Sequence, residues 1–247
     1  MFVPIGDHPN PQGVGPITIL LIFANVAVFM MVALPMSAVA PSSADPRLAA
    51  YLQALAASLP PGTSLPEVAA QLSVYDLVLF EYGYRPAAPS PLSLFTAMFL
   101  HGGLMHLLGN MLFLWIYGDN VEHRLGTIRF LFWYLATGVA ATLSHALFAM
   151  KSPLPMVGAS GAISGVLGFY FVWFPRNRVK FLVLLPFFLH VVLVPAWIAL
   201  GLYLLVDNLL PLFVAQSGAG VAYGAHIGGF VAGAIAALFM QRRPPAR

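Results

Sequence analysis

Ser160 and His226 are two polar residues whose types suit hydrolytic chemistry, and each lies among apolar and small residues. A serine hydroxyl is a weak nucleophile until a base removes its proton, and a neutral imidazole does this near physiological pH. Polar side chains buried within a membrane are costly and commonly functional. The pair therefore predicts a hydrolytic site, with Ser160 as nucleophile and His226 as base.

The residues around Ser160 read Gly158-Ala159-Ser160-Gly161. Glycine permits a tight backbone turn, and the start of a helix leaves amide N–H groups free to hold an oxyanion. Packing is the competing interpretation, because small residues let membrane helices approach closely. Taken alone, such a short string favours packing.

His226 is followed by Gly229 and Gly233, which lie one and two helical turns further along the same face. A face of small residues can approach a neighbouring helix closely. The packing interpretation and the catalytic interpretation are therefore compatible, since close packing would bring His226 to Ser160.

His106 and Asn110 are spaced i and i+4 in the segment HGGLMHLLGN, so they share a helical face, and the Asn110 amide could donate a hydrogen bond to an oxyanion. The alternative is a polar contact between helices. His101 and His106 are spaced i and i+5 and have no acidic third ligand nearby, which disfavours a metal site. We expect no metal and no cofactor, and the absence of cysteine excludes a thiolate nucleophile.

Asp207 is the acidic residue nearest to this group, toward the end of an apolar segment. It could orient His226 as the acid of a triad does. Contact with interfacial water is the commoner reason for such an aspartate, and we favour it.

The composition indicates an integral membrane protein, because 60% of the 247 residues are hydrophobic and only 8% are charged. Mean hydropathy is +0.87. A soluble domain of this size would expose large apolar patches. The net charge of +3 comes from scattered basic residues without a basic run, so no nucleic-acid partner is expected.

Apolar segments of roughly 20 residues suit membrane spans. They predict an all-α protein with six transmembrane helices at about 17–37, 103–119, 128–150, 159–174, 195–212 and 221–240. The predicted parts are a short cytoplasmic N-terminus (1–16), a membrane domain (17–240) with a long outer loop (about 38–92), and a basic cytoplasmic tail (241–247). Short helices are expected at 46–59 and 65–80, and segment 180–194 is interpreted as an interfacial approach to the fifth span.

Basic residues predict the orientation, because they are enriched on the cytoplasmic side. Basic residues follow the predicted second, fourth and sixth spans: Arg124, Arg129, Arg176, Arg178, Lys180, Arg242, Arg243 and Arg247. The ends of these three spans, and with six spans both termini, are therefore expected to be cytoplasmic. His106, Asn110, Ser160 and His226 then lie near the starts of three parallel helices. The four side chains are expected at one level, near the outer side.

Together these motifs resemble the rhomboid intramembrane serine proteases: GASG with Ser160, AHxxGxxxG with His226, HGGLMHLLGN, and GDNVEHRLG. The resemblance covers about residues 95–240. It implies a six-helix fold, a Ser160–His226 dyad, and an oxyanion hole made by His106, Asn110 and the Ser160 amide. It also implies that Glu122 and Arg124 are structural residues that hold together a loop after the second span.

The sequence departs from the family pattern at Ser164, where several members carry an aromatic ring that stacks on the catalytic histidine. His226 is therefore expected to be held differently here. The N-terminal residues 1–15 contain no Lys or Arg ahead of the first apolar run, which argues against a cleaved signal or a mitochondrial presequence.

These observations predict an intramembrane serine endopeptidase of a bacterial inner membrane, with transmembrane proteins as substrates and lipid as its other partner. One alternative is a catalytically silent rhomboid-like binding or trafficking factor, which would have lost the nucleophile or the base. Another is a transporter, which would continue its polar path through the whole membrane. Below His226 come Gly, Ala, Val and Phe, which favours hydrolysis.

Overall fold

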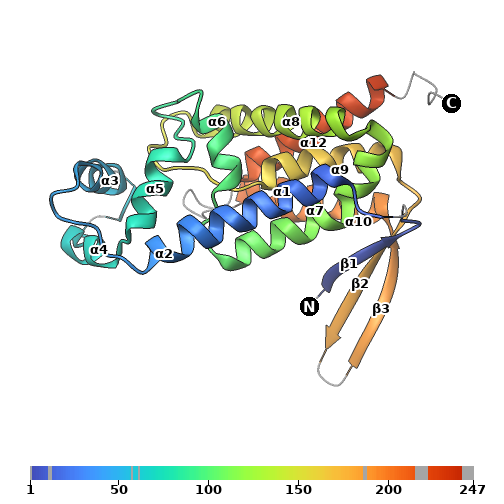
Figure 1. Cartoon of the computed structure of the whole chain (residues 1–247), viewed down its shortest axis with the longest axis horizontal. Helices are drawn as coiled ribbons and strands as arrows, with labels where there is room; N and C mark the ends of the chain where they lie inside the picture. Colours follow the sequence, from blue (N-terminus) through green and yellow to red (C-terminus); the bar gives the residue numbers. More distant parts are fainter. Residues whose placement is uncertain are drawn as a thin grey trace.

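The computed structural model describes residues 2–10, 13–56, 58–60, 62–185, 188–214 and 222–240. Its helices form an elongated bundle, with a group of short helices at one end and a small β-sheet at the other (Figure 1). The predicted tail 241–247 lies outside the described residues.

The predicted apolar segments form helices close to their expected limits. The first comprises α1 (Pro16–Val28), the π-helical segment η1 (Phe29–Ala33) and α2 (Leu34–Ser37). The fifth comprises α10 (Ala196–Leu204), the π-helical segment η3 (Leu205–Leu209) and α11 (Leu210–Val214). The others are α7 (Leu104–Leu125), α8 (Thr127–Phe148), α9 (Ser160–Trp173) and α12 (Tyr223–Met240).

Within the described residues, four helices are long and apolar enough to cross a membrane. A fifth crossing results if α7 is combined with Ser93–Phe99, made of α6 (Ser93–Thr96) and the 3₁₀ turn η2 (Ala97–Phe99), although the two parts are bent by 94°. Helix α9 has only 14 residues and is shorter than a usual span. The count of six spans stays a prediction.

The segment between the first two long helices contains three short helices: α3 (Pro46–Ala56), α4 (Leu65–Gln71) and α5 (Val74–Tyr82). The helix expected at 65–80 is therefore two helices. The break has a local cause, because Ser73 and Asp76 form a capping box that starts α5.

A three-stranded antiparallel sheet makes the all-α prediction wrong. Strand β1 (Phe2–His8) pairs with β2 (Arg178–Leu185), which pairs with β3 (Phe188–Pro195). Segment 180–194, interpreted as an interfacial approach to the fifth span, contains most of β2 and β3, and its place at the membrane interface stays a prediction. Its Val- and Phe-rich composition suits paired strands, and residues 2–8 provide a third strand from far away in the chain.

Both π-helical segments end two residues before a proline, Pro35 after η1 and Pro211 after η3. A proline has no N–H and its ring clashes with the carbonyl four residues earlier, so an ordinary helical turn is disrupted there. The wider π turn changes which residues face the bundle, and this matters for the site.

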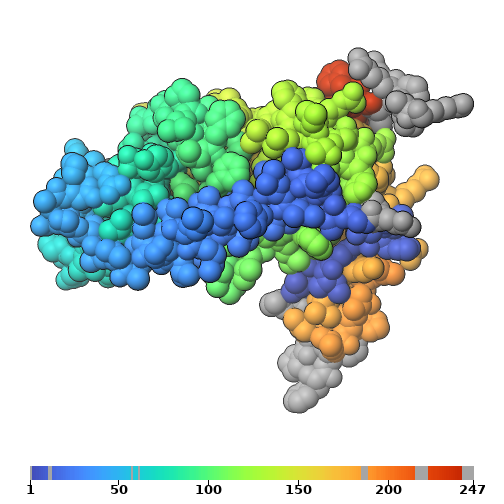
Figure 2. All heavy atoms as spheres, viewed as in Figure 1, coloured from blue at the N-terminus to red at the C-terminus, as the bar shows by residue number. Residues whose placement is uncertain are grey.

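Helices α9 and α12 pack very closely through glycines. A Cβ atom at Gly229 would collide with the carbonyl oxygen of Gly161, and one at Gly233 would collide with the carbonyl oxygen of Gly165. The predicted contact between these glycine faces is confirmed. Figure 2 shows α1 along the outside of the bundle. Helix α9 is largely buried and contacts α7, α8, α10 and α12.

Candidate active site

Ser160 and His226 meet at the start of two adjacent helices. The Ser160 Oγ lies 2.8 Å from the His226 Nε2, a hydrogen-bond distance. Ser160 is the first residue of α9, and His226 is in the first turn of α12. The predicted juxtaposition is confirmed, and its cause is the close glycine contact between the two helices.

The opposite nitrogen of His226 binds an asparagine. The His226 Nδ1 lies 2.6 Å from the Oδ1 of Asn208, whose side chain is only 1% exposed. Asp207 was the sequence candidate for this position, but its residue is exposed and no described bond joins it to His226. The hypothesis that Asp207 orients His226 is wrong on this geometry.

The π turn explains the difference between these neighbours. In an α-helix the residue that shares a face with Tyr203 is Asp207, four positions later. In a π-helix the alignment shifts to five positions, which is Asn208. Asn208 was not predicted from the sequence; the signals that could have pointed to it are its apolar setting and the nearby Pro211.

Tyr203 provides an aromatic ring beside the histidine. Its ring centroid lies 6.5 Å from that of His226, with an angle of 33° between the planes. The Tyr203 hydroxyl lies 2.7 Å from the Oγ of Ser164, which is completely buried. The ring therefore comes from α10, and Ser164 supports it by a hydrogen bond.

His106 and Asn110 lie against the glycine that precedes the nucleophile. A Cβ atom at Gly158 would lie 2.7 Å from the His106 ring and 3.7 Å from the Asn110 Nδ2. Gly158 also has φ +122°, a conformation that L side chains rarely adopt. The structure thus brings both predicted oxyanion partners to the Ser160 turn.

Asn110 also has a partner that the sequence did not indicate. Its Nδ2 lies 2.9 Å from the Nε2 of His101, a side chain that is 1% exposed. The backbone of His101 is held in turn by the Tyr75 hydroxyl. His101 therefore anchors the Asn110 amide beside the site.

Glu122 and Arg124 lie inside α7, which corrects their expected position in a loop. The Glu122 carboxylate accepts hydrogen bonds from the backbone N–H groups of Ile17 and Thr18 at 2.9 and 2.8 Å. It therefore caps the first turn of α1. The Arg124 guanidinium lies 4.6 Å from the centre of the Trp173 ring, at the end of α9.

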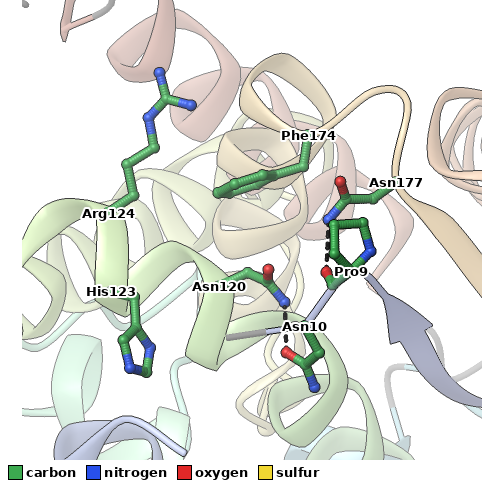
Figure 3. Close-up of a pocket in the computed structure, with 7 residues that line it drawn as sticks. All are labelled: Pro9, Asn10, Asn120, His123, Arg124, Phe174 and Asn177. Carbon is green, nitrogen blue, oxygen red and sulfur yellow. Dashed lines mark hydrogen bonds between the residues drawn. The ribbon is translucent and has the colours of Figure 1, made fainter. Parts of the chain in front are cut away.

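A second polar cluster lies at the end of the bundle away from Ser160. It lines a cavity of about 490 Å³, drawn in Figure 3, made by Pro9, Asn10, Asn120, His123, Arg124, Phe174 and Asn177. Helix α9 separates Phe174 from Ser160, a distance of about 20 Å at 1.5 Å per residue. The cavity is therefore not part of the Ser160 site.

The described contacts of the cavity join the N-terminal strand to the bundle. The Asn120 amide donates to Asn10, and the Asn177 amide donates to the Pro9 carbonyl, at 3.1 and 3.2 Å (Figure 3). Asn120 also donates to the buried Asp7, which accepts a second hydrogen bond from Tyr170.

Comparison with known proteins places this sequence in a family. The Rhomboid domain model matches residues 89–243, which include both members of the Ser160–His226 pair. The chain belongs to the rhomboid family. With its apolar helices, this makes it an integral membrane protein.

The rhomboid relatives include proteins of bacteria, plants and yeast. The chain is 38% identical over 144 residues to Rhomboid protease GluP of Bacillus subtilis, covering 58% of this chain and 25% of that protein. It is 33% identical over 155 residues to RHOMBOID-like protein 6, mitochondrial, of Arabidopsis thaliana, covering 61% and 44%. It is 30% identical over 166 residues to Rhomboid protein 1, mitochondrial, of Saccharomyces cerevisiae, covering 62% and 43%. The chain thus spans less than half the length of these relatives.

Proposed function

We propose that this rhomboid protein is an intramembrane serine endopeptidase that uses Ser160 and His226. The observation that carries the proposal is the 2.8 Å contact between the Ser160 Oγ and the His226 Nε2, at the start of a helix enclosed by other apolar helices. A nucleophile and a base within hydrogen-bond reach are the requirement for acyl transfer.

In the proposed reaction the Ser160 Oγ attacks the carbonyl carbon of a peptide bond while its proton passes to the His226 Nε2. The C–N bond then breaks and His226 gives that proton to the leaving amine, which leaves an acyl group on Ser160. Water attacks this acyl group, again with His226 as base, and the carboxylic acid and the free serine are formed.

The negative charge on the carbonyl oxygen needs nearby donors. The Ser160 amide, at the start of α9, and the side chains of His106 and Asn110 are proposed for this role. Their support is the turn at Gly158, where both side chains meet the segment that leads into Ser160. No metal or cofactor has a part in this mechanism.

Membrane-anchored proteins are the proposed substrates, cleaved in or near their transmembrane segments. A helical substrate must unwind locally, because its carbonyls are otherwise held in hydrogen bonds. We propose six spans with both termini cytoplasmic, a site that opens to the outer side, and a bacterial inner membrane. The orientation is supported by the basic residues at the end of α7, in the first turn of α8 and after α9. A basic cytoplasmic tail at 241–247 and an outer loop over 38–92 belong to the same proposal.

Two alternatives are less well supported. A catalytically silent relative would not need a serine and a histidine in bonding contact. A transporter would need a polar path across the bundle, but on α12 His226 is followed by Gly229, Phe230 and Gly233, which pack against α9 and its neighbours.

A fluorophosphonate probe, followed by mapping of the modified residue, tests the proposal without knowledge of the substrate. Wild-type protein should be labelled on Ser160 and should cleave a transmembrane peptide in detergent or lipid. Ser160→Ala should lose both, whereas Ser164→Ala should keep labelling and most of its cleavage, since Ser164 contacts Tyr203. Equal cleavage by wild type and Ser160→Ala would refute the proposal.

A further inference from the structure

We propose that Asn208 is the third member of the catalytic group, a positioning residue that fixes the ring orientation and the tautomer of His226. This inference rests on the proposed protease function, and it turns the Ser160–His226 dyad into a Ser–His–Asn triad. The role is assigned from the contacts of Asn208, which bind it to His226 on one side and to its own helix on the other.

Asn208 is held firmly and has little freedom to turn. Its side chain is 1% exposed, and its Nδ2 donates to the carbonyl oxygen of Tyr203 at 2.8 Å. A buried amide that has both ends satisfied keeps one orientation, because turning it would leave both partners unpaired.

This orientation determines the protonation pattern of the histidine. A backbone carbonyl can only accept, so the amide nitrogen of Asn208 must face Tyr203 and its Oδ1 must face His226. The Oδ1 also only accepts, so in the neutral ring the Nδ1 of His226 carries the proton. The Nε2 is then unprotonated and can accept the proton of Ser160, which is the form a base requires.

The π turn is what makes the contact possible. It aligns Asn208 with Tyr203 on the face of the fifth helical segment that meets α12. Without it, the exposed Asp207 would take that position. A neutral amide costs less to bury in a membrane than a carboxylate, and it orients the ring without adding charge.

The span that carries Asn208 also has the smallest buried share among the long apolar helices of the described residues. Only 11% of its most apolar window is buried, against 28–39% for the other long helices that pass the same length and hydropathy test. The triad therefore depends on the position of α10–α11, and a displacement of this segment would separate Asn208 from His226 while leaving Ser160 in place.

The first experiment compares Asn208→Ala with Asn208→Asp in peptide cleavage and in the rate of fluorophosphonate labelling. The alanine change should lower kcat by about 10- to 100-fold with little effect on KM. The aspartate keeps an oxygen for the His226 Nδ1–H but, when ionised, cannot donate to Tyr203. It should therefore restore much of the activity if Asn208 orients the histidine, and none if Asn208 only ties its own helix.

Asn25→Ala is the matched control. Asn25 is a completely buried asparagine of α1 whose Nδ2 donates to the Leu21 carbonyl of its own helix at 2.8 Å. It has no described contact with Ser160 or His226, so its removal should leave kcat near that of wild type. Loss of activity in Asn208→Asp as severe as in Asn208→Ala would overturn the proposal.

A second measurement reads the tautomer without using activity. In protein labelled with ¹⁵N-histidine, the His226 signals, identified by comparison with His226→Ala, should show a protonated Nδ1 and an unprotonated Nε2. Asn208→Ala should shift this pattern toward a mixture. An Nε2–H tautomer in wild type would refute the role of Asn208 even if Ser160 proves to be the nucleophile, and an Nδ1–H tautomer would support it even if cleavage fails.

Discussion

At the scale of single residues, the site is organised around three contacts to side chains of the fifth helical segment. Tyr203 and Asn208 hold His226 from two directions, and Ser164 holds Tyr203. The aromatic ring that several family members carry at the position of Ser164 is replaced by a ring from another helix. A small residue at position 164 leaves room for it.

This replacement predicts separate effects for the Tyr203 ring and its hydroxyl. Tyr203→Phe keeps the ring and loses only the bond to Ser164, so cleavage should fall by no more than about tenfold, the cost of one hydrogen bond. Tyr203→Ala removes the ring beside His226, so the cleavage rate of this variant should fall further. Cleavage rates of both variants and of Ser164→Ala check this, and a Phe variant as slow as the Ala variant would show that the hydroxyl carries the effect.

At the scale of helices, the distance between Ser160 and His226 depends on glycine. The carbonyl oxygens of Gly161 and Gly165 occupy the space that side chains at Gly229 and Gly233 would need. The two helices can therefore lie closer than ordinary side chains permit, and the short Ser160–His226 contact follows.

Gly229→Ala should separate α9 from α12. We expect a loss of about 1–3 kcal/mol in unfolding free energy from overpacking. We also expect a fall in cleavage of about 100-fold, because a shift of about 1 Å in reacting groups has that effect. Thermal unfolding in detergent and cleavage rates are the measurements. Gly201→Ala is the control, since a Cβ atom there meets nothing within 4 Å. A Gly229→Ala variant with the stability and rate of wild type would show that the helices adjust.

At the scale of the whole molecule, one end of the bundle carries the candidate active site and the other end attaches the N-terminal strand. The site lies at one end, and at the other end the β-sheet and its polar cluster tie the N-terminus to α7 and α9. Asp7 is central to this attachment, because it is buried and accepts from Asn120 and Tyr170. Burial raises the pKa of the Asp7 carboxyl.

The raised pKa predicts how stability changes with pH. The folded protein keeps the Asp7 proton to higher pH than the unfolded chain, whose value is near 3.8. The stability contributed by this proton is therefore present below pH 3.8 and is lost as pH rises through the raised pKa. Asn at this position keeps an acceptor oxygen and cannot ionise. The stability of wild type relative to Asp7→Asn should therefore decline as pH rises through that interval.

Unfolding in detergent at several pH values measures this difference. Glu67→Gln is a suitable control, since Glu67 lies on the exposed surface of α4. A difference between wild type and Asp7→Asn that does not vary with pH would contradict the prediction.

Much of the architecture follows from the sequence alone, because lipid requires long apolar helices and leaves few other arrangements for the backbone. The helix positions, the glycine faces of α9 and α12, and the level shared by Ser160, His226, His106 and Asn110 were all predicted in this way. The residue types of Ser160 and His226 also indicated a hydrolytic chemistry.

Only the tertiary structure decided which residue contacts the Nδ1 of His226. A regular 3.6-residue period selects Asp207, and the π turn before Pro211 selects Asn208 instead. The sheet could not be predicted from the sequence for a related reason. Strands β1 and β2 are separated by about 170 residues, and the pattern of a short apolar strand does not indicate which segment it pairs with. Local periodicity describes one element at a time, whereas these features depend on an irregular turn and on a contact between distant segments.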